Sequence, residues 1–267
     1  MIRLLAITIT FLTVCLGIRA QAADSVRSLN VQSAYHFGFG GTNVLDTYLS
    51  QEKFKGGGLT LLLTSEYQKS ASPWSTLLQH ELNFASVDDR ADTCNELQGD
   101  YTFLFGRYYA WRFNRLTVKA GGVGGANIGV IYNTSNSNNP AQARLSVQLM
   151  PSGIATYDFR LFKLPLKARY EVELPLAGVM FSPNYGQSYY EIFSKGNYDH
   201  NIVPTTFVSA PNIRQMLSLE YAIPHFATLR IGYLGYYQQA DVNNLKSHIF
   251  NNRLMVGIVR EIGIIRK

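Results

Sequence analysis

Charged residues of both signs occupy every second position of one short segment. Lys167, Arg169, Glu171 and Glu173 alternate with apolar residues from Leu166 onward. In a helix these four charges would spread around the cylinder, whereas in a strand they share one face. Acids and bases on one face can neutralise one another as salt bridges, or they can line a wet passage that selects charged solutes. The segment therefore predicts a strand with one charged and one apolar face.

The same alternation places charged residues on the polar faces of other segments. The charges that we expect to line the interior of the fold are Glu66, Lys119, Arg144, Lys167, Arg169, Glu171, Glu173, Arg214, Glu220, Arg230 and Arg253. His36 and Glu81 are expected on the same inner surface. In a narrow interior, interdigitated acids and bases can fill the space and find partners. We favour such a salt-bridged filling over a wet passage, and capture of a ligand at the mouth is a third possibility.

The elements that must position these charges are strands of a closed barrel. Ten segments alternate apolar and polar residues with period two, and the connections between them alternate in length. The longer connections are expected at 40–57, 88–96, 133–140, 175–211 and 240–246, and the shorter ones at 69–76, 114–115, 160–165 and 224–227. Both features are typical of an antiparallel barrel that crosses a bilayer. We predict ten strands; the segment 175–211 is rich enough in Tyr, Phe and Ile to hold another hairpin, so twelve is the alternative.

Length and hydropathy agree with a single membrane barrel. After a leader at residues 1–22, the segment 23–267 is long enough for one barrel and leaves no room for a second sizeable domain. It contains no run of 18 or more apolar residues, so a barrel is the bilayer-spanning option that remains. A water-soluble barrel of the lipocalin type is the competing fold.

The N-terminus has the pattern of a secretory signal peptide. Arg3 precedes a short apolar core, and Ala20 and Ala22 supply small residues for cleavage. Cleavage after Ala22 removes Cys15 and leaves Cys94 without a partner for an intrachain disulfide. We therefore expect export through the periplasm to the bacterial outer membrane.

Arg107 fits the strand pattern poorly. It falls on the apolar face of its segment, among aromatic residues, where a charge in contact with lipid at mid-depth costs about 2 to 4 kcal/mol. A bulge at Gly106 would turn Arg107 inward.

The sequence contains no convincing catalytic motif. Lipid hydrolases built on barrel walls use a His, any residue, a Ser and then an Asn. The nearest match here reads His80, Glu81, Leu82 and Asn83, so a leucine stands in the position of the nucleophile and His80 falls on the apolar face. We therefore predict that the chain is not an enzyme, and a lipid-modifying enzyme is kept as the last alternative.

Neither a cofactor nor a metal is expected. The five His residues show no ligand spacing. The glycines at 121, 122, 124 and 125 precede no helix pattern or phosphate-binding lysine, and close packing within a strand explains them better. The formal net charge of +6 becomes 6 − 2 = +4 without Arg3 and Arg19. This mild surplus suits an anionic lipopolysaccharide surface, and the lack of long basic runs argues against nucleic acid.

Two connections are dense in aromatic and glycine residues. One contains Gly40, Gly41 and Thr42, and the other includes Phe181 and Pro183. The candidate contact residues of the second are Tyr185, Tyr189, Tyr190 and Phe193. Flat amphipathic rings of this kind can stack on sugars or dock a partner, or they can fold down as a lid over the barrel mouth.

At these two connections the chain resembles a family of uncharacterised outer-membrane barrel proteins of anaerobic Gram-negative gut bacteria. The resemblance covers nearly all of the mature chain and implies location and fold, but no activity. Our leading hypothesis is a structural or surface-interaction barrel with a plugged, salt-bridged lumen. A narrow porin-like channel for small solutes is the alternative. The expected partners are outer-membrane lipid and lipopolysaccharide, and small solutes or a surface partner besides.

Overall fold

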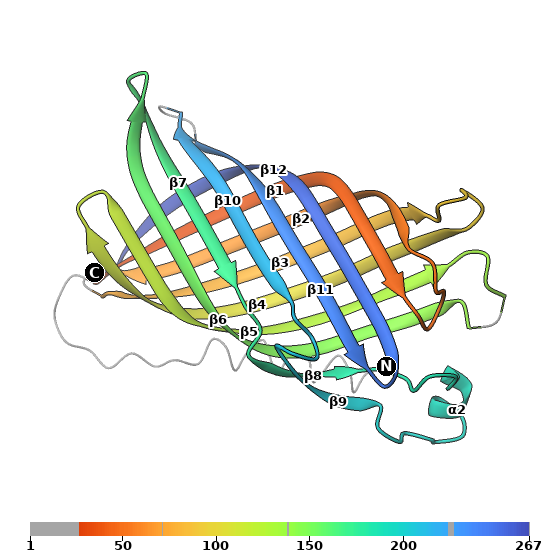
Figure 1. Ribbon diagram of the computed structural model, residues 1–267. Helices are drawn as coiled ribbons and strands as arrows, with labels where there is room; N and C mark the ends of the chain where they lie inside the picture. The colour runs from red at the N-terminus through yellow and green to blue at the C-terminus, as the bar shows by residue number, and fades with distance from the viewer. Residues whose placement is uncertain (1–26, 71, 138, 224–226, 267) are drawn as a thin grey trace.

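The computed structural model describes residues 27–70, 72–137, 139–223 and 227–266, so the expected leader at 1–22 lies outside the described residues. Long strands slant around a barrel, with a short helix at one end (Figure 1). The elements are β1 (Arg27–Asp46), β2 (Phe54–Lys69), β3 (Trp74–Asp88), β4 (Asn95–Phe113), β5 (Leu116–Asn133), β6 (Ala141–Leu161), β7 (Leu164–Glu173), β8 (Ala177–Phe181), α2 (Tyr189–Phe193), β9 (Ile202–Thr206), β10 (Ile213–Ala222), β11 (Thr228–Val242) and β12 (Leu245–Arg266).

Ten of the strands form a closed antiparallel ring. The neighbours run β5, β4, β3, β2, β1, β12, β11, β10, β7 and β6, and a β5–β6 pairing closes the circle. The predicted all-β fold and ten-strand barrel are therefore confirmed. No helix in the described part of the chain is long and apolar enough to cross a membrane.

β8 and β9 are additional strands outside the closed ring, which keeps ten strands. β6 pairs with β7 up to Ser152 and Glu173, and then with β8 from Leu149 and Ala177. β8 therefore continues the path of β7 along β6, and β9 pairs with β8 alone. The hairpin that we considered as an alternative within 175–211 exists, but it extends the wall at one end instead of widening the barrel to twelve strands.

Alternation of side chains explains why these segments form a wall. On β1, Tyr35 is 55% exposed while its neighbours Ala34 and His36 are 2% and 4% exposed. Successive strand residues point to opposite faces, so one row meets the surroundings and the other fills the barrel. The exposed row includes Phe37, Leu61, Phe84, Phe105, Ile128, Val147, Leu217, Ile231 and Leu254. This apolar outer belt is what a lipid-facing surface requires.

Most of the expected connections are shorter than predicted, and three of them change the picture of the barrel ends. The expected loop 40–57 is mostly strand, with Gly40 opposite Gly58 and Gly41 opposite Gly57 in the β1–β2 ladder. A Cβ at Gly58 would come within 2.4 Å of the Arg253 guanidinium, so this glycine marks close packing and not a turn. The expected loop 240–246 is a tight turn at residues 243 and 244, both with positive φ. The expected loop 175–211 shortens because β8 and β9 occupy part of it.

The bulge at Gly106 that would have turned Arg107 inward is not formed. The registers of β4 with β3 and β5 run without interruption through Gly106 and Arg107, so Arg107 stays on the outer face. Its Nη1 donates to Thr76 Oγ1 at 2.6 Å, and its guanidinium lies 5.5 Å from the centre of the Trp74 ring. A hydroxyl and an aromatic face therefore stabilise the charge where it stands.

The inside of the barrel is packed with apolar clusters as well as charges. One cluster joins Leu77, Leu104 and Met150 with neighbours on β3 to β6. A second joins Leu62 and Met255 with residues of β10 and β11. Two more lie nearer the end that carries α2. Such clusters exclude water in the same way as the core of a soluble protein.

Candidate functional site

Three ion pairs cross the bore between strands on opposite sides of the ring. β2 and β7, β3 and β10, and β1 and β6 are each separated by five steps in the ten-strand circle. The ion pairs between them are Glu66–Arg169, Glu81–Arg214 and Asp46–Arg144. Each of these ion pairs therefore joins opposite walls of the barrel through its interior.

The first crossing joins β2 to β7. Arg169 Nη1 lies 3.4 Å from Glu66 Oε2, and Lys119 on β5 forms an ion pair with the other oxygen of Glu66. Arg169 Nη2 also donates to Glu171 Oε2 at 2.9 Å. Glu66 is therefore shared by two cations, and Arg169 links it to the next level of the network.

The second crossing is the most deeply buried. Arg214 on β10 contacts Glu81 Oε2 at 2.9 Å, Glu173 Oε2 at 3.2 Å and Glu171 Oε1 at 3.6 Å. Gln79 on β3 donates to Glu171 Oε1 at 2.5 Å. One guanidinium thus holds three carboxylates, which would repel one another without it.

The third crossing lies nearer to α2 and is looser. Arg144 Nη1 is 3.9 Å from Asp46 Oδ2, and Arg144 Nη2 donates to Gln238 Oε1 at 3.3 Å. Arg253 lies within the same half, and no carboxylate in the described part of the chain forms an ion pair with it. Its guanidinium donates to Thr60, Thr42 and the carbonyl of Gly41 instead.

All the charges that we expected in the interior are buried or half-buried in the structure. Glu66, Glu171, Glu173, Arg169, Arg214, Glu220, Arg230 and Arg253 are buried, while Lys119, Arg144 and Lys167 are half-buried. Arg230 Nη2 contacts Glu220 at 2.6 Å, separately from the three crossings. Asp46 was not among the expected interior charges, because the segment 40–57 was expected to be a loop. The available signal was that Asp46 continues the alternation of β1, in which every second residue faces the interior.

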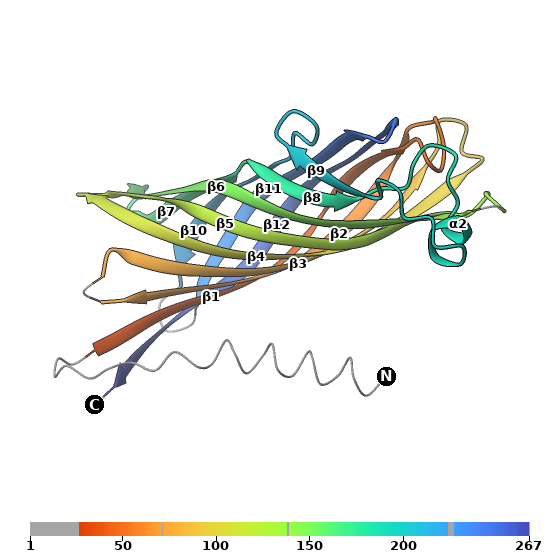
Figure 2. The same ribbon diagram turned by 90° about the horizontal axis from the view of Figure 1, so that it is seen from below.

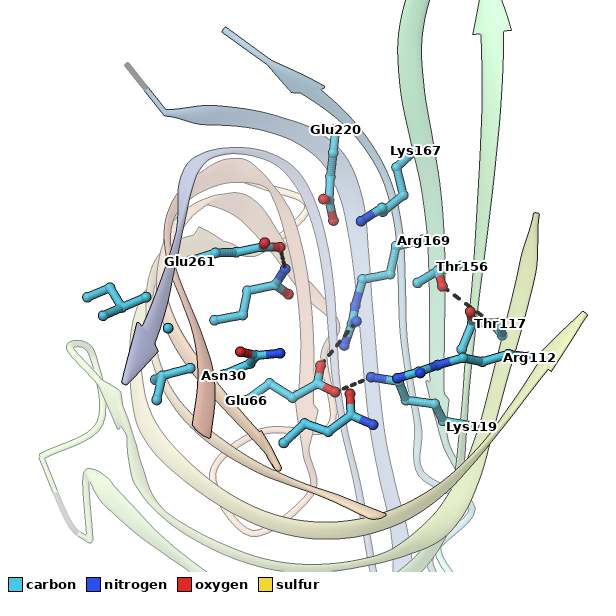
Figure 3. Close-up of a pocket in the computed structure, with 15 residues that line it drawn as sticks. Asn30, Glu66, Arg112, Thr117, Lys119, Thr156, Lys167, Arg169, Glu220 and Glu261 are labelled. Atoms are coloured by element: carbon cyan, nitrogen blue, oxygen red, sulfur yellow. Dashed lines mark hydrogen bonds and ion pairs between the residues drawn. The ribbon is translucent and has the colours of Figure 1, made fainter. Parts of the chain in front are cut away.

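At one end of the barrel the charges border an open hollow. This end, where β1 begins and β12 ends, is called the N-terminal mouth. The hollow has a volume of about 360 Å³. Figure 3 shows Arg112, Lys119 and Arg169 reaching into it from one side, with Glu261 facing them from the other. The Glu66–Arg169 crossing forms its inner limit.

At the opposite end, called the loop mouth, the aromatic loop is partly folded against the barrel. Both views place α2 at the far end of the barrel from the β6–β7 turn (Figures 1 and 2). The Tyr189 hydroxyl donates to Gln142 Oε1 at 2.8 Å and accepts from the Ala143 backbone at 2.7 Å. Its ring meets Tyr48 of the β1–β2 loop edge to face at 5.8 Å. Burial raises the pKa of Tyr189 above its usual range.

The remaining candidate contact residues point outward. Tyr185, Tyr190 and Phe193 are 68%, 63% and 63% exposed. A capping box fixes the start of α2, where Ser188 and Glu191 exchange hydrogen bonds. The Ser188 backbone N–H, with its hydroxyl, holds the pKa of Glu191 below its usual range. The loop is therefore ordered, with one tyrosine turned in and three rings presented to the outside.

The segment 80–83 does not assemble a catalytic pair. His80 lies on the outer face of β3 and bonds the Tyr101 hydroxyl at 2.7 Å. Asn83 points into the bore, where its amide donates to Glu81 and Asp100. The two residues that would act together lie on opposite sides of the wall.

A family model described as "Protein of unknown function (DUF3316)" matches residues 5–267. The chain belongs to this family. No curated protein matches it at a significant level. The resemblance to an uncharacterised outer-membrane barrel family is thereby confirmed.

Solved structures with a similar arrangement are bacterial outer-membrane barrels. The protease OmpT of Escherichia coli has a TM-score of 0.46 and 8% identity, covering 92% of this chain and 99% of its own. The transport unit of the autotransporter AIDA-I of Escherichia coli has a TM-score of 0.45 and 7% identity, covering 97% of both chains. Ail of Yersinia pestis, in complex with the heparin analogue sucrose octasulfate, has a TM-score of 0.33 and 12% identity, covering 87% and 99%. Likeness at this level carries no argument about function.

The closed ladder of strands and the apolar outer belt are sufficient to assign the chain to a class of protein. Backbone groups in hydrocarbon must be paired within the protein, and a closed barrel meets that requirement without free edges. The exposed rows on its strands are apolar, and the buried charges lie in its interior among apolar clusters. The chain is therefore a membrane-spanning barrel of the bacterial outer-membrane type.

Proposed function

We propose that this protein is a non-conducting outer-membrane barrel of structural or surface-interaction type, with a plugged and salt-bridged lumen. The single observation that supports this most strongly is the Glu81–Arg214 ion pair, which joins opposite walls at 2.9 Å. Apolar clusters on both sides of the charge network leave little space for a column of water. A hydrated ion would have to break these contacts to pass.

The surface-interaction part of the proposal rests on the loop mouth. Tyr185, Tyr190 and Phe193 present exposed rings from an ordered loop, and Lys195 lies 5.5 Å from the centre of the Tyr190 ring. Aromatic rings held in place give contact area at low entropic cost. These groups fit lipopolysaccharide or a surface protein as the partner. In this proposal the leader at 1–22 directs the export of a single barrel domain at 23–267.

A narrow porin-like channel is the second candidate. The observation in its favour is the open hollow of about 360 Å³ at the N-terminal mouth, which brings water as far as Arg169. A lipid-modifying enzyme remains the last alternative, and the outward position of His80 gives it no support.

Conductance in planar bilayers separates the first two candidates. We expect the wild-type protein to produce no discrete openings, and the double variant Glu81→Ala with Arg214→Ala to produce them, because this change removes the central crossing. A matched double variant that also removes one acid and one base, Glu52→Ala with Lys53→Ala in the exposed β1–β2 loop, should remain silent. Discrete wild-type openings whose ion selectivity changes in Arg169→Gln would overturn the plugged barrel in favour of a channel.

A further inference from the structure

The hollow at the N-terminal mouth is larger than one cavity. The hollow of about 360 Å³ shares Lys167, Glu220 and Glu261 with a neighbouring hollow of about 570 Å³. Together they form an open vestibule. It lies between the Glu66–Arg169 crossing and the N-terminal mouth, at the end of the barrel opposite to α2 (Figure 1). The vestibule ends at the Glu66–Arg169 crossing, so a molecule can enter it from the N-terminal mouth alone.

The carboxylates that line the hollow of about 360 Å³ already have partners. Glu66 contacts Lys119 and Arg169, and Glu220 contacts Arg230 at 2.6 Å. Glu261 accepts a hydrogen bond from Gln32 at 2.6 Å. Each of these three acids is thus engaged within the barrel itself, whereas the neighbouring hollow adds Asp158, which lies opposite Lys167 in the β6–β7 ladder, together with Arg115 and Arg160.

Two cations of the same wall are not engaged. Within the described residues, Arg112 on β4 and Lys167 on β7 line the hollow without an ion pair or hydrogen bond. Figure 3 shows both side chains on the wall that also carries Thr117 and Thr156. The hollow of about 360 Å³ therefore offers two spare positive charges beside hydroxyl donors, next to two further cations that Glu66 shares.

We infer that the vestibule is a binding site for a phosphate group, held by Arg112 and Lys167. A guanidinium binds phosphate oxygens in a forked geometry, and a lysine ammonium adds a mobile point charge. Two spare cations match the double charge of a phosphate monoester. This inference goes beyond the proposed function, because a phosphate can bind at the mouth of either a plugged or an open barrel.

Two sources share this chemistry. With the N-terminal mouth in the periplasm, as is usual for barrels of this type, a phosphorylated solute can reach the vestibule from the periplasm. A phospholipid of the adjacent leaflet can also turn its headgroup into the mouth. Both sources would use the same two cations.

The first experiment titrates inorganic pyrophosphate into the full barrel in a zwitterionic detergent and follows the heat of binding. We expect saturable binding that weakens by about tenfold or more in Arg112→Gln with Lys167→Gln, because two charge-assisted contacts are lost. The matched variant Lys53→Gln with Arg90→Gln carries the same charge change at the loop mouth and should bind as the wild type does. Absence of wild-type binding, or equal loss in both double variants, overturns the inference.

The second experiment separates the sources with the barrel in nanodiscs of phosphatidylcholine or phosphatidylglycerol. Weaker pyrophosphate binding in phosphatidylglycerol, with no such difference in the Arg112→Gln and Lys167→Gln variant, assigns the site to a lipid headgroup. Equal binding in both lipids assigns it to a soluble phosphate compound. Bilayer conductance is independent of either result, so failure here leaves the plugged-barrel proposal to its own test.

Discussion

The guanidinium of Arg214 lies 2.9 Å from the carboxylate of Glu81, although the two side chains come from strands on opposite sides of the ring. Both are buried, and Arg214 holds Glu171 and Glu173 as well. A contact that spans the bore constrains both walls at once. It therefore belongs to the packing of the barrel as much as to its electrostatics.

Removal of this guanidinium should be strongly destabilising. Arg214→Ala leaves buried carboxylates without a counter-charge, and we expect a loss of about 3 to 5 kcal/mol in the free energy of unfolding. Urea titration in detergent micelles, followed by the heat-dependent shift in electrophoretic mobility, measures it. Arg90→Ala in an exposed loop should change stability by less than about 0.5 kcal/mol. Equal effects of the two changes would show that the crossing contributes little.

The faces of the strands were predictable because the contrast between lipid and interior acts on every second residue. Arg169 is buried and Tyr170 is exposed, as their alternation indicates. The partners of the charges were not predictable. Arg214 and Glu81 are 133 residues apart in sequence, so a local pattern can list both residues without pairing them.

The glycine-rich strand ends were hidden from sequence reasoning for a different reason. Glycine weakens strands on average, so the run around Gly58 favoured a loop. Its cause is long-range: the guanidinium of Arg253 from β12 passes where a side chain would lie. Only the folded ring brings the two together.

Adjacent glycines of β5 should respond differently to the same substitution. A Cβ at Gly121 would come within 2.0 Å of the Arg107 carbonyl oxygen, while a Cβ at Gly122 meets nothing within 4 Å. We expect Gly121→Ala to cost about 1 to 3 kcal/mol of stability through overpacking. Gly122→Ala should stay within about 0.5 kcal/mol of the wild type. Unfolding midpoints in urea test the pair, and a larger loss at Gly122 would contradict the observed packing.

Order in the loop around α2 should depend on pH. The pKa of Glu191 is held below its usual range by the backbone N–H and hydroxyl of Ser188. A depressed pKa in the folded loop means that the ionised carboxylate stabilises it above the unfolded pKa. This stabilisation is lost as the pH falls through the folded value.

Hydrogen exchange of the α2 amides across acid pH measures this effect. Protection should fall as Glu191 becomes protonated, and Glu191→Gln should show weaker protection that no longer changes over the same range. Amides of the β11–β12 turn provide the internal reference. An unchanged profile in Glu191→Gln would assign the pH dependence to another group.

Arg107 tests where the hydrocarbon ends on the outer face. Its guanidinium lies beside Thr76 and Trp74, and Tyr109 stands edge to face with Trp74 at 5.2 Å. Aromatic residues of this kind form the interfacial girdles of membrane barrels. At such a level a charge costs about 0 to 1 kcal/mol, so Arg107→Leu should change the folding free energy by about 1 kcal/mol or less.

The matched change in the opposite direction is Leu217→Arg on β10. Leu217 is 55% exposed on the outer belt, and an arginine there should cost about 2 to 4 kcal/mol if it meets mid-bilayer hydrocarbon. Equilibrium folding into lipid vesicles from urea measures both variants. If Arg107→Leu stabilised the barrel by as much as Leu217→Arg destabilised it, Arg107 would lie in the hydrocarbon and the girdle would be wrongly placed. A small effect at Arg107 with a large cost at Leu217 sets the membrane boundary between them.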